Sequence, residues 1–163
     1  MDYKNKTFVI GDLILDEYIV GKEYRISDEA PVPIVKVDSF LTQLGGAANV
    51  ANNLKKLGSD VILCGAIGDP SSGYSAIRFL EEMRKNDLIT FCISEQPMKT
   101  TTKSRVIIKN QQVVRFDYED NFIPKSAHEE IIEKIKIIDF RTISLIVVSD
   151  YSKGVINKEI IDL

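Results

Sequence analysis

The sequence has little of what several enzyme classes need. Its 163 residues include no tryptophan, one histidine and two cysteines. The histidine, His128, falls in a charged helix start and is expected on the surface, so acid–base catalysis would have to use a carboxylate. Cys64 and Cys92 fit no spacing of a metal or redox site, which predicts two reduced core thiols in a cytosolic protein.

Two nucleotide-binding motifs are also missing. No Gly-x-Gly-x-x-Gly follows the first strand-like segment and no Gly-x-x-x-x-Gly-Lys-Ser/Thr occurs, so neither a dinucleotide loop nor a P-loop is supported. The net charge is -3 without a dominant basic patch. Nucleic acid is therefore not expected as a partner, and a few placed cations must hold any anionic ligand. Neither a signal peptide nor a membrane-spanning stretch is found, so we expect a cytoplasmic protein without a membrane partner.

The apolar residues that are present follow an α/β pattern. Near-continuous apolar runs at 60–67 and 144–148 predict strands buried on both faces, and shorter strands are predicted at 7–10 and 89–93. Helical spacing marks further segments, and the segment at 126–137 begins with the capping box Ser126 and Glu129. These helical segments are 46–57, 72–85 and 126–137, with another helix starting at 157. This alternating order predicts a largely parallel sheet flanked by helices.

Polar, alternating segments do not fit that sheet. They predict a small second sheet that is solvated on one side, built from 13–20, 33–37, 103–109 and 112–118. The segment 33–37 starts with proline and reads as an edge strand, while 24–33 reads as a loop. A turn is expected at Asn110-Gln111, because asparagine tolerates the positive φ that such a turn needs.

A pair of glycines opens the first helical segment. Gly45 and Gly46 let the backbone approach a ligand closely, and the helix N-terminus offers free N–H groups. Asn49, in the first turn, can donate and accept hydrogen bonds towards a sugar hydroxyl. The alternative is a tight turn whose small residues serve helix packing.

Polar residues also follow two of the predicted buried strands. Asp12 and Asp16 come after the first strand, at the edge where open α/β sheets bind ligands, and a carboxylate there can accept bonds from two adjacent hydroxyls. The alternative is a carboxylate that caps a turn. After the strand at 144–148, Lys153 can meet a phosphate and Asp150 can order the loop, or the segment is a plain polar loop closed by Gly154.

Cations alternate along the predicted hairpin. Lys103 and Lys109 favour cross-strand ion pairs, whereas Arg105 and Arg115 can hold a phosphate through the planar guanidinium fork. A two-residue loop at Asn110-Gln111 would place the two arginines on opposite faces. A three-residue loop at 109–111 would set them directly opposite each other on one face. The sequence does not choose between these registers.

Six segments, spread over nearly the whole chain, carry a combined pattern. They are 9–16 (VIGDLILD), 25–35 (RISDEAPVPIV), 45–51 (GGAANVA), 102–105 (TKSR), 110–117 (NQQVVRFD) and 149–154 (SDYSKG). Together they resemble the PfkB (ribokinase-like) carbohydrate kinases. The second and fifth segments narrow the resemblance to the kinase domain of the bacterial D-glycero-β-D-manno-heptose-7-phosphate kinase/ADP-heptose synthase proteins.

The resemblance implies a fold and a reaction. It implies an α/β core with a small β-sheet lid over the sugar site, and transfer of the ATP γ-phosphate, with Mg²⁺, to the anomeric hydroxyl of a heptose 7-phosphate. The product would feed ADP-heptose synthesis for a lipopolysaccharide-type surface glycan. Asp16 and Asn49 would bind sugar hydroxyls beside the glycine pair. The full set of substrate-binding candidates is Asp12, Asp16, Gly45, Gly46, Asn49, Arg105, Asn110, Arg115 and Lys153.

One part of the family pattern is absent. The Gly-Ala-Gly-Asp segment, which supplies the family's catalytic aspartate and anion hole, does not occur, and the chain stops inside a helical pattern. We therefore expect residues 1–163 to be a truncated N-terminal portion of one kinase domain, with lid segments at about 13–40 and 102–119. This portion should be inactive, bind neither ATP nor metal, and form a homodimer through the lid. The alternatives are a PfkB kinase for another sugar and a non-catalytic dimerising fragment.

Overall fold

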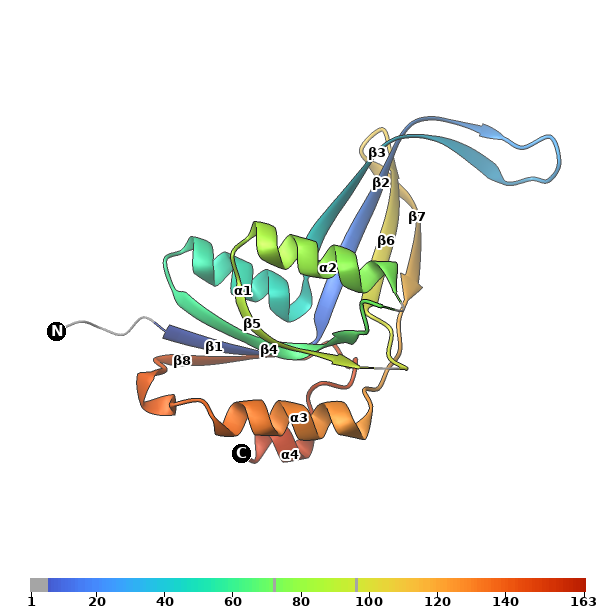
Figure 1. Cartoon of the computed structure of the whole chain (residues 1–163). Helices are drawn as coiled ribbons and strands as arrows, with labels where there is room; N and C mark the ends of the chain where they lie inside the picture. The colour runs from blue at the N-terminus through green and yellow to red at the C-terminus, as the bar shows by residue number, and fades with distance from the viewer. Residues whose placement is uncertain (1–5, 72, 96) are drawn as a thin grey trace.

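The architecture combines a layered core with a projecting sheet (Figure 1). The structure is a computed structural model that describes residues 6–71, 73–95 and 97–163. A parallel sheet, here sheet A, has the strand order β5-β4-β1-β8. Its strands are β1 (Lys6–Gly11), β4 (Asp60–Gly68), β5 (Ile89–Glu95) and β8 (Leu145–Ser149). The predicted parallel sheet is confirmed.

Helices cover both faces of sheet A. They are α1 (Gly46–Lys56), α2 (Tyr74–Lys85), α3 (Lys125–Lys136) and α4 (Lys158–Ile161), with a short 3-10 turn at Phe140–Thr142. Helices α1 and α2 lie on one face and α3 and α4 on the other (Figure 1). Successive residues of β1 point to opposite faces, so Val9 enters the core under α1 and α2, whereas Phe8 and Ile10 enter the core over α3. Burial on both faces explains the unbroken apolar run of β4.

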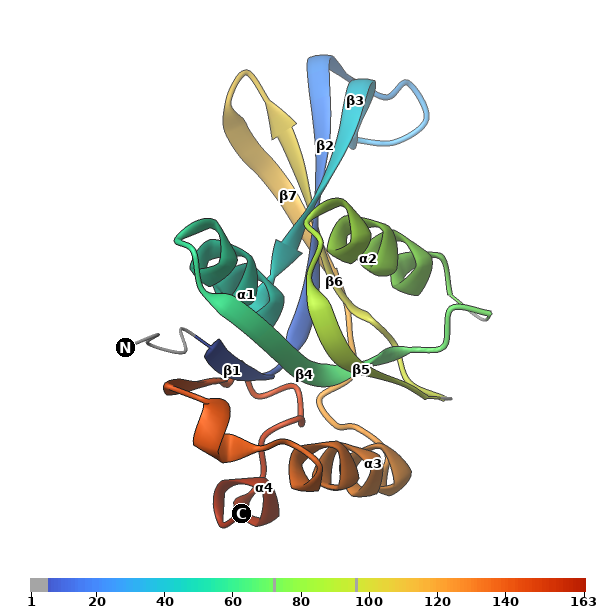
Figure 2. The same cartoon turned by 60° about the vertical axis from the view of Figure 1, so that its left-hand side comes forward.

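The second sheet, here the lid, rises away from the core (Figure 2). Its strand order is β3-β2-β6-β7, with β2 parallel to β6 and the other neighbours antiparallel. The strands are β2 (Leu13–Ile26), β3 (Pro33–Gly45), β6 (Thr101–Ile108) and β7 (Gln111–Tyr118). The edge position predicted for the segment at 33–37 is confirmed. The predicted loop at 24–33 is too long, because residues 24–26 still pair with β3.

Two local predictions are wrong. Strand β8 was expected to be buried, yet Leu145, Ile146 and Val148 are about half exposed, because β8 is the edge strand of sheet A. The capping box at Ser126 is also wrong. Helix α3 begins one residue earlier, with Pro124 at the N-cap position and no side-chain capping bond. No helix in the described ranges is long and apolar enough to cross a membrane.

Candidate functional site

Three segments meet at Asp12, where β1 ends. The Asp12 amide donates to the Ser149 carbonyl at 3.1 Å, and the Asp12 carbonyl accepts from the Ala47 amide at 2.9 Å. Gly46 makes this junction possible. It adopts a left-handed φ of +55°, and a Cβ there would lie 2.3 Å from the Asp12 carbonyl oxygen. The carboxyl ends of β1 and β8 and the start of α1 therefore form one rigid edge.

The carboxylate of Asp16 has a prepared place on β2. A Cβ at position 45 would lie 2.4 Å from Asp16 Oδ2, so Gly45 leaves room for the carboxylate. Arg105 Nη1 donates to Asp16 Oδ1, and both side chains are about one-fifth exposed. The guanidinium also lies 5.5 Å from the centroid of the Tyr18 ring. The hydrogen bond to Asp16 is the main cause that raises the pKa of Arg105.

The turn between β6 and β7 decides how the two arginines face each other. Lys109 and Asn110 both have positive φ, and Ile108 pairs with Gln111, so the loop is Lys109-Asn110. Both predicted loops are therefore wrong in position. A bulge beyond Val106 then shifts the register by one, and Arg105 pairs directly with Arg115. Bulge and turn together give the one-face arrangement that a three-residue loop was expected to give.

Register partners share a face, so one face of the lid collects charges. Asp16 pairs with Lys103, and Lys103 pairs with Asp117. Together with the two arginines they form the charged lid face, which consists of Asp16, Lys103, Arg105, Arg115 and Asp117. Arg115 Nε lies 3.0 Å from Asp117 Oδ1. The three cations outnumber the two carboxylates, so this face can receive an anionic ligand.

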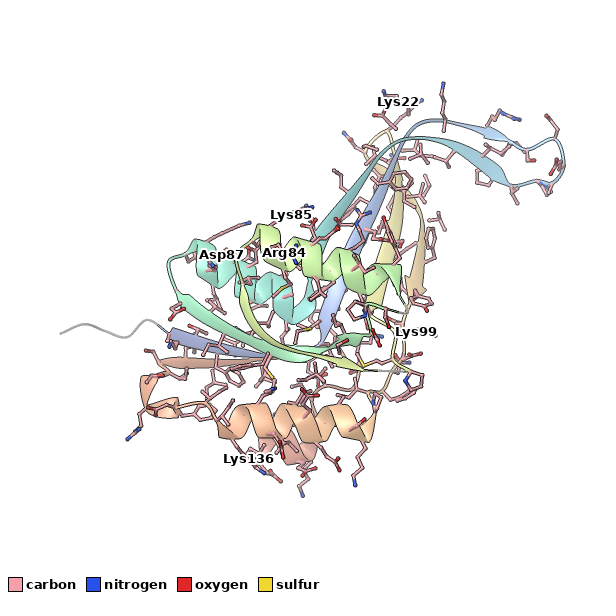
Figure 3. All side chains as sticks on the ribbon, viewed as in Figure 1. Lys22, Arg84, Lys85, Asp87, Lys99 and Lys136 are labelled. Carbon is pink, nitrogen blue, oxygen red and sulfur yellow. The ribbon has the colours of Figure 1, made fainter. Side chains whose placement is uncertain are left out.

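The β8–α4 loop, residues 150–157, lies against the lid. Lys103 Nζ is 5.9 Å from the centroid of the Tyr151 ring. Lys153 Nζ contacts Glu119 Oε1 at 2.7 Å and Asn121 Oδ1 at 3.1 Å, so this lysine is engaged with the end of β7. A second ion pair, between Lys99 and Asp120 at 3.0 Å, ties the base of the lid, where Figure 3 labels Lys99.

The nine predicted site residues thus fall into separate groups. Asp16, Gly45, Arg105 and Arg115 meet on or beside the charged lid face, and Asp12, Gly46 and Lys153 meet at the edge of sheet A. Asn49 is exposed, accepts a bond from Asn53 and lines a polar depression of about 250 Å³ with Gln43 and Glu82. Asn110 occupies the hairpin tip, five residues or about 16 Å along the strand from Arg105.

Sequence reasoning missed two contributors. Tyr151 was treated as part of a polar loop, yet its ring lies beside Lys103. His128 was expected to lie plainly on the surface, yet it is half-buried and its Nε2 lies 2.8 Å from the Gly154 carbonyl oxygen. Both contacts join positions far apart in the chain, so no local pattern signals them. Within the described ranges, no group of three or more histidine, cysteine or acidic side chains can hold a metal ion.

Comparison with known proteins gives the same picture at the level of family. The pfkB family carbohydrate kinase model matches residues 4–163. The chain is 44% identical over 160 residues to "Bifunctional protein HldE" of Helicobacter acinonychis, which covers 95% of the chain and 33% of that protein. It is 41% identical over 156 residues to the protein of that name from Sulfurimonas denitrificans, with coverage of 95% and 32%. The chain spans about one-third of the length of these relatives.

Solved structures share the fold. Phosphofructokinase-2 from Escherichia coli, solved with fructose-6-phosphate, superposes with a TM-score of 0.65 at 16% identity, covering 88% of this chain and 44% of that one. A possible 1-phosphofructokinase from Thermotoga maritima gives a TM-score of 0.68 at 19% identity, with coverage of 96% and 48%. The ribokinase-like α/β fold, with its parallel sheet and its curled mixed sheet, is therefore shared with these structures.

Proposed function

The chain belongs to the PfkB family of carbohydrate kinases, and we propose that it is the sugar-binding portion of an ATP-dependent heptose-7-phosphate 1-kinase. Identity of about 40% to HldE proteins over 95% of the chain supports the heptose branch. The full-length enzyme would then act in the cytoplasm, where it would supply ADP-heptose as the precursor of a surface glycan. The alternative is a PfkB kinase for another sugar, and a comparison of substrates must distinguish it from a heptose-7-phosphate kinase.

The charged lid face carries the proposal. Asp16 would accept hydrogen bonds from sugar hydroxyls, and its bond to Arg105 would fix the orientation of the carboxylate. Arg105, Arg115 and Lys103 would neutralise the phosphate of the sugar, because they form one cationic cluster on the same face. The glycine pair would lie beside the same substrate, and Asn49 would reach it from the first turn of α1, next to the depression that it lines with Gln43. Asn110 would act only through the shape of the hairpin turn.

We propose that phosphoryl transfer also uses groups that the described residues do not supply. The family's reaction uses ATP and Mg²⁺, which together supply the phosphoryl group and neutralise its charge. The described residues hold no acidic cluster that suits a metal, so we assign this chain no step through Mg²⁺. We propose that residues 1–163 are the N-terminal portion of one kinase domain, with lid segments at about 13–40 and 102–119. The base would lie beyond Leu163, and this portion alone would not turn over sugar.

We also propose a homodimer through the lid. Large apolar side chains of the lid strands are exposed, including Phe40 at 65% and Phe116 at 50%. An exposed apolar surface of this kind marks an interaction site. The charged lid face on the other side of the same strands favours one specific pairing over aggregation.

A kinetic comparison tests the proposal. In the full-length kinase, Asp16→Asn and Asn49→Ala should each lower kcat/KM for heptose 7-phosphate about 5- to 150-fold, since removing one partner of a polar contact that the bound sugar buries costs about 1–3 kcal/mol. Asp38→Asn is the matched control, because Asp38 pairs with Lys22 on the lid away from Gly45. Unchanged kcat/KM in both variants would return Asp16 and Asn49 to structural roles. Turnover of other sugars but no heptose phosphate would sink the heptose assignment.

A further inference from the structure

The carboxylate of Asp12 is buried, and both of its oxygens accept hydrogen bonds from backbone amides of the same chain. Its side chain is 1% exposed. Oδ2 accepts hydrogen bonds from the Tyr151 amide at 2.7 Å and from the Lys153 amide at 3.1 Å, and Oδ1 accepts from the Val155 amide at 3.1 Å. A sugar hydroxyl therefore has no access to this carboxylate, although the sequence offered Asp12 as a substrate ligand.

The loop is shaped to present those three amides. Ser152 and Gly154 have positive φ values of 58° and 102°, which alternate with residues of negative φ. Such alternation turns successive N–H groups into a concave nest that binds an anion. Gly154 is required for it, since a Cβ there would lie 2.8 Å from Phe122 Cα. The anion in this nest is Asp12, from the far end of the chain.

Asp12 thereby connects the edge of sheet A, the start of α1 and the β8–α4 loop. Its backbone fixes the end of β8 and the first turn of α1, next to the glycine pair. Its side chain fixes the β8–α4 loop. From this loop the Tyr151 ring contacts Lys103, and Lys153 contacts Glu119 at the end of β7. The lid is thus connected to sheet A through the loop that Asp12 organises.

From these contacts we infer that Asp12 is a positioning residue, which holds the β8–α4 loop so that Tyr151 and Lys153 meet the lid, and which does not touch the sugar. The inference rests on the proposed function only in taking this loop to border the sugar site. The hydrogen bonds that define the positioning role belong to the chain itself and are measured without substrate.

Amide hydrogen exchange of this chain, followed by NMR, tests the positioning role. Asp12→Asn keeps one acceptor oxygen but turns an NH₂ group towards an N–H donor. We expect the amides of Tyr151, Lys153 and Val155 to exchange at least tenfold faster, and the ring-current shift of the Lys103 side chain beside Tyr151 to disappear. Amides that join β1 to β4 should keep their protection. Unchanged exchange at the three loop amides in a folded variant would overturn the inference.

Two controls keep the result decisive. Asp150→Asn changes a carboxylate in the same loop whose Oδ1 accepts from the Ser152 amide, and it should leave the three amides protected. If Asp12→Asn does not fold, the wild-type chain still decides, because the three amides must exchange more slowly than that of Ser152. Equal exchange at all four would overturn the inference.

A kinetic arm separates this inference from the proposed function. In the full-length kinase, Asp12→Asn should raise KM for heptose 7-phosphate at least tenfold and leave KM for ATP unchanged. An unchanged sugar KM would overturn the link between the loop and the sugar. If the unmodified full-length protein phosphorylates no heptose phosphate, the proposed function fails, whereas the exchange experiment still decides what Asp12 does.

Discussion

The two sheets of this molecule have four strands each, but they are stabilised in different ways. Sheet A buries β1 and β4 between helices on both faces, so its stability depends on apolar packing. The lid has α2 against β2 and β3, while every residue of β7 is exposed. The face of the lid that does not contact α2 is the charged lid face. The charged lid face therefore lies where burial ends, on strands that can present charge because packing does not require apolar residues there.

The largest expected difference between the two regions is the loss of stability when one phenylalanine side chain in each is truncated to alanine. Phe79 on α2 is 0% exposed and packs in the core above sheet A. Phe79→Ala should destabilise the chain by about 3–5 kcal/mol, because it removes buried surface and leaves a cavity. Phe116→Ala on β7, where the ring is 50% exposed, should cost the monomer only about 0.5 kcal/mol, when it is measured at concentrations too low for a dimer. Urea unfolding followed by circular dichroism measures both.

Equal losses for the two phenylalanine variants would break the comparison. That result would mean that the lid is as closely packed in solution as sheet A, through a partner surface or a rearrangement of β7. A small effect for both would instead show that α2 is held by contacts other than the buried ring.

The second effect concerns binding. In the full-length kinase, Arg105→Ala should raise KM for heptose 7-phosphate about ten- to hundredfold, because a charge-assisted hydrogen bond contributes about 1.5–3 kcal/mol. KM for ATP should stay constant. Lys109→Ala, at the hairpin tip, is the control on the same strand pair. An unphosphorylated heptose distinguishes the roles of Arg105. Equal losses for both sugars would mean that Arg105 serves only to hold Asp16.

The third effect locates the self-association surface. Phe40→Lys on β3 should weaken a lid-mediated homodimer about tenfold, or about 1.4 kcal/mol, because it places a charge in the exposed apolar row. Ile146→Lys makes a matched change on β8, where the side chain is 52% exposed, and should leave the dimer intact. Sedimentation at several concentrations gives both dissociation constants. The opposite ranking would place the contact on the edge of sheet A.

The sequence predicted sheet A better than the lid for a physical reason. Apolar periodicity reports burial, so α1, β4 and β1 were found close to their observed bounds. The same signal cannot tell an edge from a centre, which is why β8 was expected to be buried. The length of β2 beyond Val20 was missed because the pairing that extends it lies on β3.

Within the site, residue types could be predicted but their partners could not. Asp16 and Arg105 were candidates by type and position, yet their bond joins residues 89 positions apart. The direct pairing of the two arginines depends on a bulge and on a turn one residue earlier than expected. The role of Asp12 depends on amides more than 130 residues away, in a loop whose dihedral angles no local rule fixes.

The smallest effect is a pH dependence of stability that reports on sheet A alone, because both cysteines lie in that sheet and the lid has none. Burial raises the pKa of the Cys64 thiol from 9.0 to about 12, against the smaller opposite effect of the Lys134 charge. The protonated thiol is therefore favoured in the folded state. Its contribution to stability is fully present below pH 9 and is lost as pH rises towards 12. Between pH 7.5 and 9.5 the wild-type chain should lose about 0.8 kcal/mol more unfolding free energy than Cys64→Ala. Burial, followed by the charge of Cys64, raises the pKa of the Cys92 thiol to about 12, and burial still acts on Cys92 in the Cys64→Ala variant, so its contribution is nearly the same in both proteins. A pH-dependent loss of unfolding free energy that is the same in the wild-type chain and in Cys64→Ala would show that water reaches Cys64 in the folded state, and that burial does not set sheet A apart from the lid.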